Sequence, residues 1–557
     1  MKWLWYQIRP FTLRLLIITA IGVVLSLLTV SIAVFSKNII DAAAGGKVNL
    51  AVKYAVMFVF VIIIQITLDG IYSALSTRTQ EALANNIRLK SYEKISTASW
   101  MDYSRYHSED ILTRMTSDIG TVTNGVVNIL PGIVSLGARL VAAFITLLMF
   151  EPVLAIAAFV LGPFTVLFSR FFVRKLKFMH IKIQEAESTY RAYIHEAIQN
   201  MLIIKAFNLE KAAGEKIGNL QNDRQSWIYK RSRLSAVSNS VLSFSYWAGY
   251  FLAFIWGAVR LSAGAITFGT LTAFLQLSGQ IQGPIVMLAR NIPQLIAMLA
   301  SSERLMEFNL LESEKDDLQE LSCPLAGLRF EDVSFSYESE KAVLRNVNFE
   351  IQQGDVVVVT GPSGEGKTTI IRLILSLIRA QDGRVYFTGT DNTLCEAGVN
   401  TRKLVAYVPQ GNTLFSGTIA ENLRTGCNTS TDEELEEALT SACAWDFVAA
   451  LPEGINTRIG ERGQGLSEGQ AQRITIARAF LRKAPIIIFD EATSALDAAT
   501  EIKILQSLKR LKPSRTSIII SHRPAALKIC NRVLKLEDGS IFDYREDLDE
   551  ETINRAV

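Results

Sequence analysis

Cysteine is scarce in this chain, and the few cysteines present form no cluster. The 557 residues include only five, all of them beyond the first 300 positions: Cys323, Cys395, Cys427, Cys443 and Cys530. No pair has the Cys-x-x-Cys spacing of a zinc or redox site, and the spacings indicate no disulfide framework. We therefore expect neither a thiolate metal site nor disulfides, and reduced thiols in the cytosol.

A large net charge and a cleavable leader are also missing. Lys and Arg number 57 against 54 Asp and Glu, a net charge of +3, which gives no reason to expect nucleic acid as a partner. The first apolar run is too long for a signal peptide and lacks a clear small-residue cleavage site. It is typical of an uncleaved membrane anchor.

Long apolar stretches dominate the first half of the chain. Six of them have the ~20 residues needed to cross a bilayer, near positions 11–36, 51–76, 127–150, 152–173, 236–262 and 268–299. The connections 77–126 and 174–235 are long, helical in pattern and rich in Lys and Arg, which places them and both termini in the cytoplasm. We predict a multi-pass helical domain of the cell membrane over residues 1–310, with six spans and long cytoplasmic helix extensions.

Several polar and aromatic residues interrupt the predicted spans. Such polar groups are costly against lipid and usually face a bundle interior or a watery cavity. Helix–helix hydrogen bonds explain many of them equally well. Both interpretations stay open for Gln65, Asp69, Arg139, Tyr246, Trp247, Tyr250, Gln276, Gln280, Gln282, Arg290, Asn291 and Gln294.

The pattern changes after a polar, charged segment at 311–326, which we interpret as a linker. From 327 to 557, short strands and turns precede strands that alternate with helices, which predicts an α/β domain with a mainly parallel sheet. In this domain the stretch Thr360 to Thr369, T-G-P-S-G-E-G-K-T-T, follows the apolar run 356–359 and precedes an apolar-periodic helix. Strand, glycine-rich turn and helix together are the context of a P-loop.

The P-loop spacing G-x-x-x-x-G-K-T predicts how nucleotide phosphates are held. Backbone N–H groups of the loop, at a helix N-terminus, would face the phosphates. Lys367 would reach the outer phosphates, and the Thr368 hydroxyl would ligate Mg²⁺. The predicted phosphate site comprises Gly361, Pro362, Ser363, Gly364, Glu365, Gly366, Lys367, Thr368 and Thr369.

A second apolar strand, 486–489, ends in two carboxylates. Asp490 at its end suits Mg²⁺, directly or through water. Glu491 is then placed to polarise the attacking water. An apolar strand that ends in acids is common by itself, but the upstream P-loop favours ATP hydrolysis.

The segment Leu466-Ser467-Glu468-Gly469-Gln470 resembles the signature of ATP-binding-cassette (ABC) proteins. The resemblance covers nearly the whole chain, because six spans before one cassette resemble an ABC exporter half-transporter. Ser108–Asp118 and Lys205–Glu210 look like the coupling helices of such a half-transporter. The resemblance implies an α-helical polytopic membrane domain followed by an α/β P-loop nucleotide-binding domain.

The resemblance also implies roles for single residues. Tyr337 would stack on adenine, Gln410 of the Q-loop would assist catalysis and ligate Mg²⁺, and His522 would contact the γ-phosphate. Residues of the signature and the D-loop would contact nucleotide bound to a second cassette: Ser467, Gly469, Gln470 and Asp497.

Two positions depart from the family pattern. Pro524, two residues after His522, stands where an apolar side chain such as Leu is more usual, and Glu468 stands where the signature usually has glycine. A carboxylate there could slow turnover by repulsion if it pointed toward the nucleotide. We expect it to point away.

The implied function is ATP-driven export by a dimer, because the P-loop of one cassette faces the signature of another. Intact Glu491, Ser467 and His522 favour a homodimer, although a partner chain could carry degenerate elements. ATP and Mg²⁺ would drive an amphipathic or hydrophobic substrate (drug, lipid or peptide) out of the cytoplasm or inner leaflet by alternating access. An ATP-gated channel or transport regulator on the same scaffold is the alternative.

Overall fold

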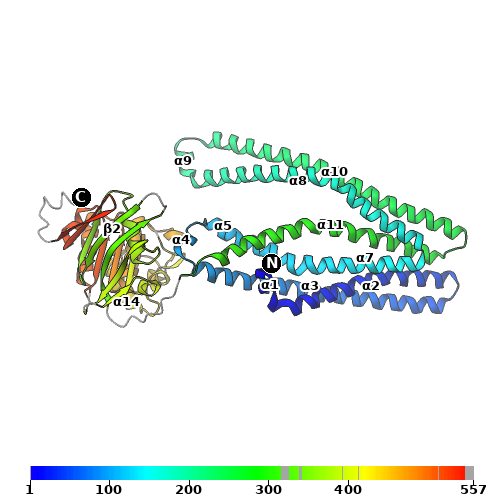
Figure 1. Cartoon of the computed structure of the whole chain (residues 1–557), viewed down its shortest axis with the longest axis horizontal. Coiled ribbons are helices and arrows are strands. Elements are labelled where there is room, and N and C mark those ends of the chain that lie inside the picture. The colour runs from blue at the N-terminus through cyan, green and yellow to red at the C-terminus, as the bar shows by residue number, and fades with distance from the viewer. Residues whose placement is uncertain are drawn as a thin grey trace. The chain divides into compact units, whose positions relative to one another are not determined.

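The structure is a computed structural model that describes residues 2–314, 325–337, 342–389, 391, 393–411, 413–511 and 514–545. The chain forms two compact units (Figure 1). The helical unit comprises Met1–Ile95 and His107–Leu310, and the sheet unit comprises Ser96–Tyr106 and Leu311–Val557. Most of the predicted linker, together with Cys323, lies outside the described residues.

Long helices make up the helical unit. Their bounds are α1 Lys2–Ile8, α2 Thr12–Ala44, α3 Val48–Ser96, α5 Ser108–Thr113, α6 Ile119–Asn124, α7 Leu130–Phe150, α8 Pro152–Gln199, α9 Met201–Ala206, α10 Glu210–Ser262 and α11 Phe268–Leu310. Helices α8 and α10 continue from the apolar stretches into the charged ones without a break, so the charged connection is a helical hairpin that turns at α9 (Figure 1).

Four helical runs in the described part of the chain are long and apolar enough to cross a membrane: Trp3–Ala44, Val48–Ser96, Ser108–Phe150 and Phe268–Leu310. They contain the spans predicted at 11–36, 51–76, 127–150 and 268–299. The spans predicted at 152–173 and 236–262 fall in α8 and α10, where many side chains lie outside the described residues. For these two stretches, crossing the membrane stays a prediction.

Two π-helical segments interrupt the run from Ser108 to Phe150. They are η2, Arg114–Asp118, and η3, Gly125–Ile129. Such segments are rare and commonly adapt a helix to a neighbour or a functional site. Beside η3 the backbones lie close together, because a Cβ on Gly125 would come within 2.3 Å of Sδ of Met298 in α11.

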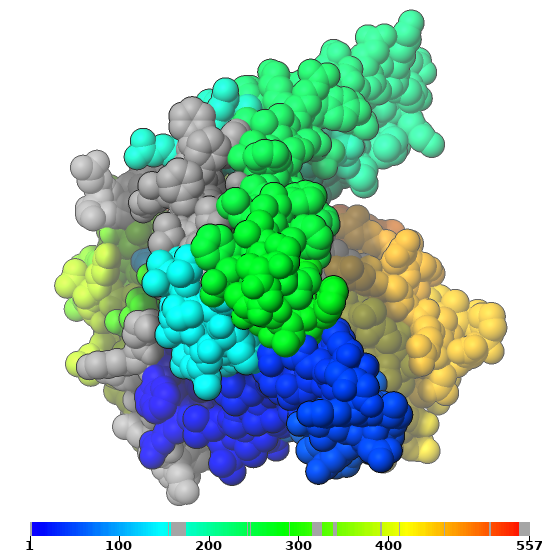
Figure 2. Space-filling view, turned by 90° about the vertical axis from the view of Figure 1, so that its right-hand side faces the viewer, coloured from blue at the N-terminus to red at the C-terminus, as the bar shows by residue number. Residues whose placement is uncertain are grey.

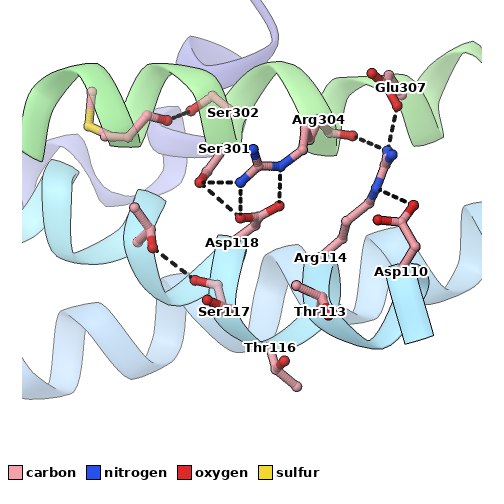
Figure 3. A network of polar contacts seen from close by, with 12 residues as sticks. Asp110, Thr113, Arg114, Thr116, Ser117, Asp118, Ser301, Ser302, Arg304 and Glu307 are labelled. Atoms are coloured by element: carbon pink, nitrogen blue, oxygen red, sulfur yellow. Dashed lines mark hydrogen bonds and ion pairs between the residues drawn. The ribbon is translucent and has the colours of Figure 1, made fainter. Parts of the chain in front are cut away.

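A polar network joins η2 to the last turns of α11 (Figure 3). The carboxylate of Asp118, a residue only 3% exposed, accepts hydrogen bonds from Nε and Nη2 of Arg304 at 2.8 and 2.5 Å and from Oγ of Ser301 at 2.9 Å. One helical turn away, Arg114 donates to the Arg304 carbonyl at 2.8 Å and to Glu307 at 2.5 Å. The two helices are therefore fastened by buried charge as well as by apolar packing.

Charged side chains also link the helices at the end of the helical unit where α2 meets α3, α7 meets α8 and α10 meets α11. Arg260 of α10 pairs with the buried carboxylate of Glu151, which lies between α7 and α8, at 2.8 Å. Asp41 of α2 accepts the backbone N–H of Gly269 in α11 at 2.9 Å. Figure 2 views this end directly and shows the surfaces of these turns adjoining one another.

The sheet unit contains a six-stranded, mainly parallel sheet of order β12-β11-β3-β10-β9-β6 and a four-stranded antiparallel sheet of order β2-β1-β4-β5. The first has β3 Val356–Thr360, β6 Val405–Val408, β9 Ile486–Asp490, β10 Thr516–Ile520, β11 Arg532–Glu537 and β12 Ser540–Arg545. The second has β1 Leu325–Ser336, β2 Ala342–Ile351, β4 Asp382–Gly389 and β5 Leu394–Glu396. Helices follow most parallel strands: α12 Lys367–Ile374, α13 Ile419–Arg424, α14 Asp432–Ser441, α16 Glu468–Leu481, α17 Ala498–Arg510 and α18 Pro524–Ile529.

The central strands are fully buried because both faces of the parallel sheet are covered. Every residue of β3, β9 and β10 is buried, and these strands are built mainly from Val and Ile. Continuous apolar runs of this kind are typical of parallel strands with a layer on each side. One layer is the antiparallel sheet with α12, and the other contains α14, α16 and α17.

A short helix, α4 Trp100–Tyr103, belongs to the sheet unit although it follows α3 in the chain. Trp100 and Met101 pack against the core beneath the antiparallel sheet. Backbone hydrogen bonds join this segment to the chain just after α11, from Ser99 N to Glu312 O and from Glu314 N to Thr97 O, both 2.8 Å. The expectation that Ser108–Asp118 forms the first coupling helix was wrong, because the apolar side chains that contact the cassette core are in α4.

Candidate nucleotide site

Four neighbouring parallel strands end at one edge of the six-stranded sheet. The P-loop follows β3, His522 follows β10, the Asp490-Glu491 pair ends β9, and Gln410 follows β6. Carboxyl ends of parallel strands meet at the same edge, where ligands of open α/β sheets commonly bind. Residues that are up to about 160 positions apart in the sequence thus lie along the same edge of the sheet.

The P-loop conformation leaves no room for a Cβ atom at two of its glycines. Gly361 has φ +139°, and a Cβ there would lie 2.3 Å from the carbonyl oxygen of Leu536. Gly366 has φ +111° at the N-cap of α12, and its Cβ would lie 2.7 Å from Cγ1 of Val343. Glycine alone adopts such backbone angles without strain. The loop therefore presents backbone rather than side chain at the helix N-terminus, which favours an anion.

Lys367 is buried at the start of α12, and its ammonium donates to two backbone carbonyls. The distances are 2.5 Å to Gly361 O and 2.9 Å to Pro362 O. Burial lowers the pKa of Lys367, while the charges of Glu491 and Asp490 act in the opposite direction. A phosphate group at the loop would supply this buried cation with an anionic partner. Thr368, the predicted Mg²⁺ ligand, is exposed beside it.

The two carboxylates at the end of β9 differ in their surroundings. Asp490 is buried, accepts a hydrogen bond from the Tyr407 hydroxyl at 3.1 Å, and has its pKa raised by burial and further by the neighbouring Glu491. Glu491 is partly exposed and lies in the left-handed region at φ +48°. Its carboxylate accepts the Gln410 amide at 2.7 Å. Left-handed backbone costs a non-glycine residue on the order of 1–3 kcal/mol and tends to occur at functional positions.

The donor set at this edge suits Mg²⁺ shared with phosphates. A hydroxyl (Thr368), a carboxylate (Asp490) and an amide oxygen (Gln410) are hard oxygen ligands of the kind Mg²⁺ prefers. The described residues contain no group of three or more His, Cys, Asp or Glu that could hold a metal alone. The residues therefore fit an ion that is completed by nucleotide oxygens and water.

Tyr337 follows strand β1 and presents an aromatic surface near the P-loop helix. Its ring meets Phe335 edge-on at 4.9 Å, and its hydroxyl is 3.3 Å from Oγ1 of Thr369. Arg372 of α12 donates to the same hydroxyl at 2.8 Å and lies over the ring. The ring is 39% exposed, which leaves a face for stacking. Arg372 is a residue that the sequence motifs did not identify.

The signature residues occupy a different place, at the N-terminus of α16. Ser467 caps this helix: its hydroxyl accepts from Gln470 N at 3.3 Å, while its own N–H donates to the Gln470 side chain at 2.9 Å. Glu468 is exposed. Gly469 lies against Ala495, since a Cβ would come within 3.0 Å of that carbonyl. Among the described residues no hydrogen bond joins Ser467–Gln470 to the P-loop.

The D-loop, residues 494–497, is held by two side chains that the motifs did not predict. Gln472 of α16 accepts from Ala495 N at 3.1 Å, and Arg523 donates to the carbonyls of Leu496 at 2.8 Å and Ser494 at 2.5 Å. Arg523 directly follows the exposed His522, so this loop is tied to the strand that carries the predicted γ-phosphate contact. Asp497 caps α17, and its hydrogen bonds with Thr500 lower its pKa.

Some polar residues of the predicted spans are engaged in helix packing. Gln280 of α11 is buried and donates to the carbonyl of Thr29 in α2 at 3.0 Å, and Gln65 of α3 donates to the Thr29 hydroxyl at 3.4 Å. Gln282 is buried against Gly249 of α10. Trp247 and Arg290 are exposed instead, so they remain candidates for a substrate surface. The side chain of Tyr246 lies outside the described residues.

The fold and the site together define a P-loop ATPase joined to a helical membrane domain. Family models agree with this class: residues 15–285 match the ABC transporter transmembrane region and residues 344–494 match the ABC transporter model. The chain belongs to the ABC transporters, with the fused membrane domain and cassette of an exporter half-transporter. It is thus a membrane protein that binds and hydrolyses ATP.

Relatives cover nearly the full length of the chain. A Bacillus subtilis (strain 168) protein named for multidrug export, the ATP-binding/permease protein YgaD, is 28% identical over 96% of this chain and 94% of its own length. A Rickettsia bellii (strain RML369-C) export ATP-binding/permease protein is 28% identical over 93% and 92%. A solved bacterial Atm1-family ABC exporter with ATP bound matches with a TM-score of 0.81 at 21% identity, covering 98% of this chain and 96% of that one.

Proposed function

We propose that this protein is an ATP-driven exporter that works as a dimer by alternating access. Its substrate would be amphipathic or hydrophobic (a drug, lipid or peptide) and would leave the cytoplasm or inner leaflet. The observation that carries the proposal is the separation of the site into two parts. The P-loop, Asp490 and Glu491 lie along one sheet edge, whereas within the described part of the chain the signature at α16 makes no hydrogen bond to the P-loop. A second cassette would complete each ATP site.

An exposed apolar tip also supports a dimer. The turn between α8 and α10 carries Leu202, which is 79% exposed, and Phe207, which is 69% exposed. Bare apolar side chains at the end of a long charged hairpin are costly unless a partner covers them. A second copy of the chain supplies such a partner, and the intact catalytic residues favour a homodimer over a heterodimer.

We assign a step of the mechanism to each residue of the sheet edge. Glu491, oriented by Gln410, would polarise the attacking water, and His522 would contact the γ-phosphate. Lys367 and the loop N–H groups would neutralise the phosphates, while Thr368, Asp490 and Gln410 would hold Mg²⁺. Tyr337 would stack on adenine. ATP binding would close two cassettes and turn the membrane domain outward, and hydrolysis would reset it. The excess of Lys and Arg in the long connections supports a cytoplasmic position for the cassette.

Glu491→Gln tests this mechanism directly. Loss of a general base slows a reaction by about 10²–10⁴-fold, so the variant should bind ATP and hydrolyse it at least about 100-fold more slowly. Glu436→Gln removes an exposed carboxylate from α14, outside the nucleotide site, and serves as the matched control, with turnover close to that of the unaltered protein. Hydrolysis by Glu491→Gln at the normal rate would refute the assignment of the base.

Transport itself is tested in inside-out vesicles. ATP-dependent uptake of a fluorescent amphiphile, absent in the Glu491→Gln variant, is the expected result. An ATP-gated current without vectorial uptake would instead identify a channel.

A further inference from the structure

Six basic side chains gather on the antiparallel pair α8 and α10. We call them the basic patch: Arg174, Lys175 and Lys177 on α8, and Lys230, Arg231 and Arg233 on α10. All six are exposed. The two helices run side by side (Figure 1), and the rings of Phe178 and Trp227, 6.4 Å apart, bring the two basic segments to the same level.

The basic patch has no acidic partner. The sequence contains no Asp or Glu from 152 to 184 or from 224 to 302. The neighbouring bases Lys182 and Arg224 pair with Glu185 and Glu187, but none of the six patch residues forms an ion pair within the described part of the chain. Six unneutralised cations on one surface repel one another, and an external anion would relieve that repulsion.

The patch lies where the helices leave the predicted spans. Arg233 directly precedes the uncharged stretch 234–259 of α10. On α8, the 22 steps from Pro152 to Arg174 rise about 33 Å, close to the ~30 Å thickness of the hydrocarbon core. With α8 and α10 crossing the membrane as predicted, the six cations would be level with the headgroups of one leaflet rather than with bulk solvent.

Aromatic side chains accompany the bases at this level. Trp227 packs against Phe178, and Nζ of Lys230 lies 4.3 Å from the centre of the Trp227 ring. Tyr229 is 57% exposed. Trp and Tyr concentrate at membrane–water interfaces, where one part of the ring contacts acyl chains and the other contacts water. Their presence gives a second reason, independent of charge, to place this surface at the interface.

Other helix segments that leave the predicted spans are mixed in charge. The α3 extension 77–96 carries Glu81 and Glu93 among its bases, and the last turns of α11 carry Glu303 and Glu307 beside Arg304. A general excess of cytoplasmic Lys and Arg therefore does not account for the patch. Its purely basic character is a local property of the α8–α10 pair.

We propose that the basic patch binds the phosphate of anionic phospholipid headgroups in the cytoplasmic leaflet. Clusters of Lys and Arg immediately cytoplasmic of a membrane span attract anionic lipids, each base contributing about a fivefold factor in affinity. The cytoplasmic placement rests on the orientation in the proposed function, whereas the recognition of an anionic headgroup rests on the patch alone.

The test uses the purified full-length protein in neutral detergent, without ATP. Phosphatidylglycerol and phosphatidylcholine that carry the same fluorophore and acyl chains are titrated separately, and binding is followed by fluorescence anisotropy. The unaltered protein should prefer phosphatidylglycerol at least tenfold, and the preference should fall as NaCl is raised. The triple variant Arg174→Gln, Lys175→Gln, Lys177→Gln should lose about ten- to one-hundredfold of that preference.

The control variant Lys205→Gln, Lys211→Gln, Lys216→Gln removes the same charge from exposed positions nearer the α9 turn. It should keep the preference. Equal loss in both triple variants, or no loss in the patch variant, would overturn the proposal. Displacement of the lipid by inorganic phosphate alone would identify a free-phosphate site instead. ATPase activity is measured on the same preparation, so that loss of hydrolysis with intact lipid preference would count against the export function only.

Discussion

Substituting Arg304 should destabilise the protein much more than substituting Asp118, although the two residues form one ion pair. The Asp118 side chain is 5% exposed, whereas the Arg304 side chain is 48% exposed. If the arginine is removed, a buried carboxylate keeps only the Ser301 hydroxyl as a donor. If the aspartate is neutralised, the guanidinium can turn to water. The two single substitutions therefore leave behind very different unpaired groups (Figure 3).

Magnitudes follow from these exposures. Removing one partner of a buried pair typically costs 3–5 kcal/mol, and Arg304→Met should fall near the lower limit, about 3 kcal/mol, since half of Arg304 is already hydrated. Asp118→Asn should cost about 1 kcal/mol, because an amide oxygen still accepts the Ser301 hydroxyl and the remaining guanidinium is solvated. The double variant should cost less than the sum by about 2 kcal/mol, since no buried charge remains.

Apparent melting temperatures of the detergent-solubilised protein test this double-mutant cycle. At roughly 2 °C per kcal/mol for a large domain, Arg304→Met should melt about 6 °C lower and Asp118→Asn about 2 °C lower. The double variant should melt above Arg304→Met alone. Equal effects of the two single substitutions, or strict additivity, would refute the reasoning from burial.

Two further predictions concern the nucleotide site. Burial raises the pKa of Asp490, so this carboxyl keeps its proton to higher pH in the folded state than in the unfolded chain. The protein therefore loses stability as the pH rises from the pKa of the unfolded state through that of the folded state. Asp490→Asn should therefore raise the nucleotide-free melting temperature at pH 7 by about 2–4 °C, equivalent to about 1 kcal/mol, with the gain shrinking toward pH 4, as followed by scanning fluorimetry. Gly361→Ala should weaken ATP binding at least about tenfold, because the new Cβ would meet the Leu536 carbonyl. At Gly364, with φ +91°, a Cβ would have no atom within 4 Å, so Gly364→Ala should lose less ATP affinity in a nucleotide-binding titration.

Sequence patterns predicted the fold class because it depends on apolar runs and turn chemistry that act locally. The runs at 356–359 and 486–489 lie in fully buried parallel strands, and the P-loop lies between β3 and α12 as its spacing required. The order of strands at the sheet edge is not local. The pairing of β10 between β3 and β9 brings His522 beside the P-loop, and no motif contains that information.

The contacts that support the carboxylates of the site could not be predicted from local patterns for the same reason. Tyr407 donates to Asp490 across 83 positions, and Gln410 donates to Glu491 across 81. The role predicted for Gln410 came from family resemblance, and nothing around Tyr407 resembles a motif. Only the neighbouring position of β6 and β9 in the sheet makes either contact possible.

The misplaced coupling helix has a further consequence for how the two units are connected. The chain passes between them three times, into and out of the sheet unit at the two ends of 96–106 and into it again after α11. On the sheet side these crossings are joined by the backbone bonds of Thr97 and Ser99 to residues 312–314. On the helical side they are joined by Asp118 and Arg304. The segments next to the crossings are therefore hydrogen-bonded to each other within each unit, and we predict that this linkage helps ATP hydrolysis to drive transport. Arg304→Met should then lower transport per ATP hydrolysed more than it lowers hydrolysis itself, which vesicle uptake and phosphate release measured together would show; a parallel fall in both would confine the network to stability.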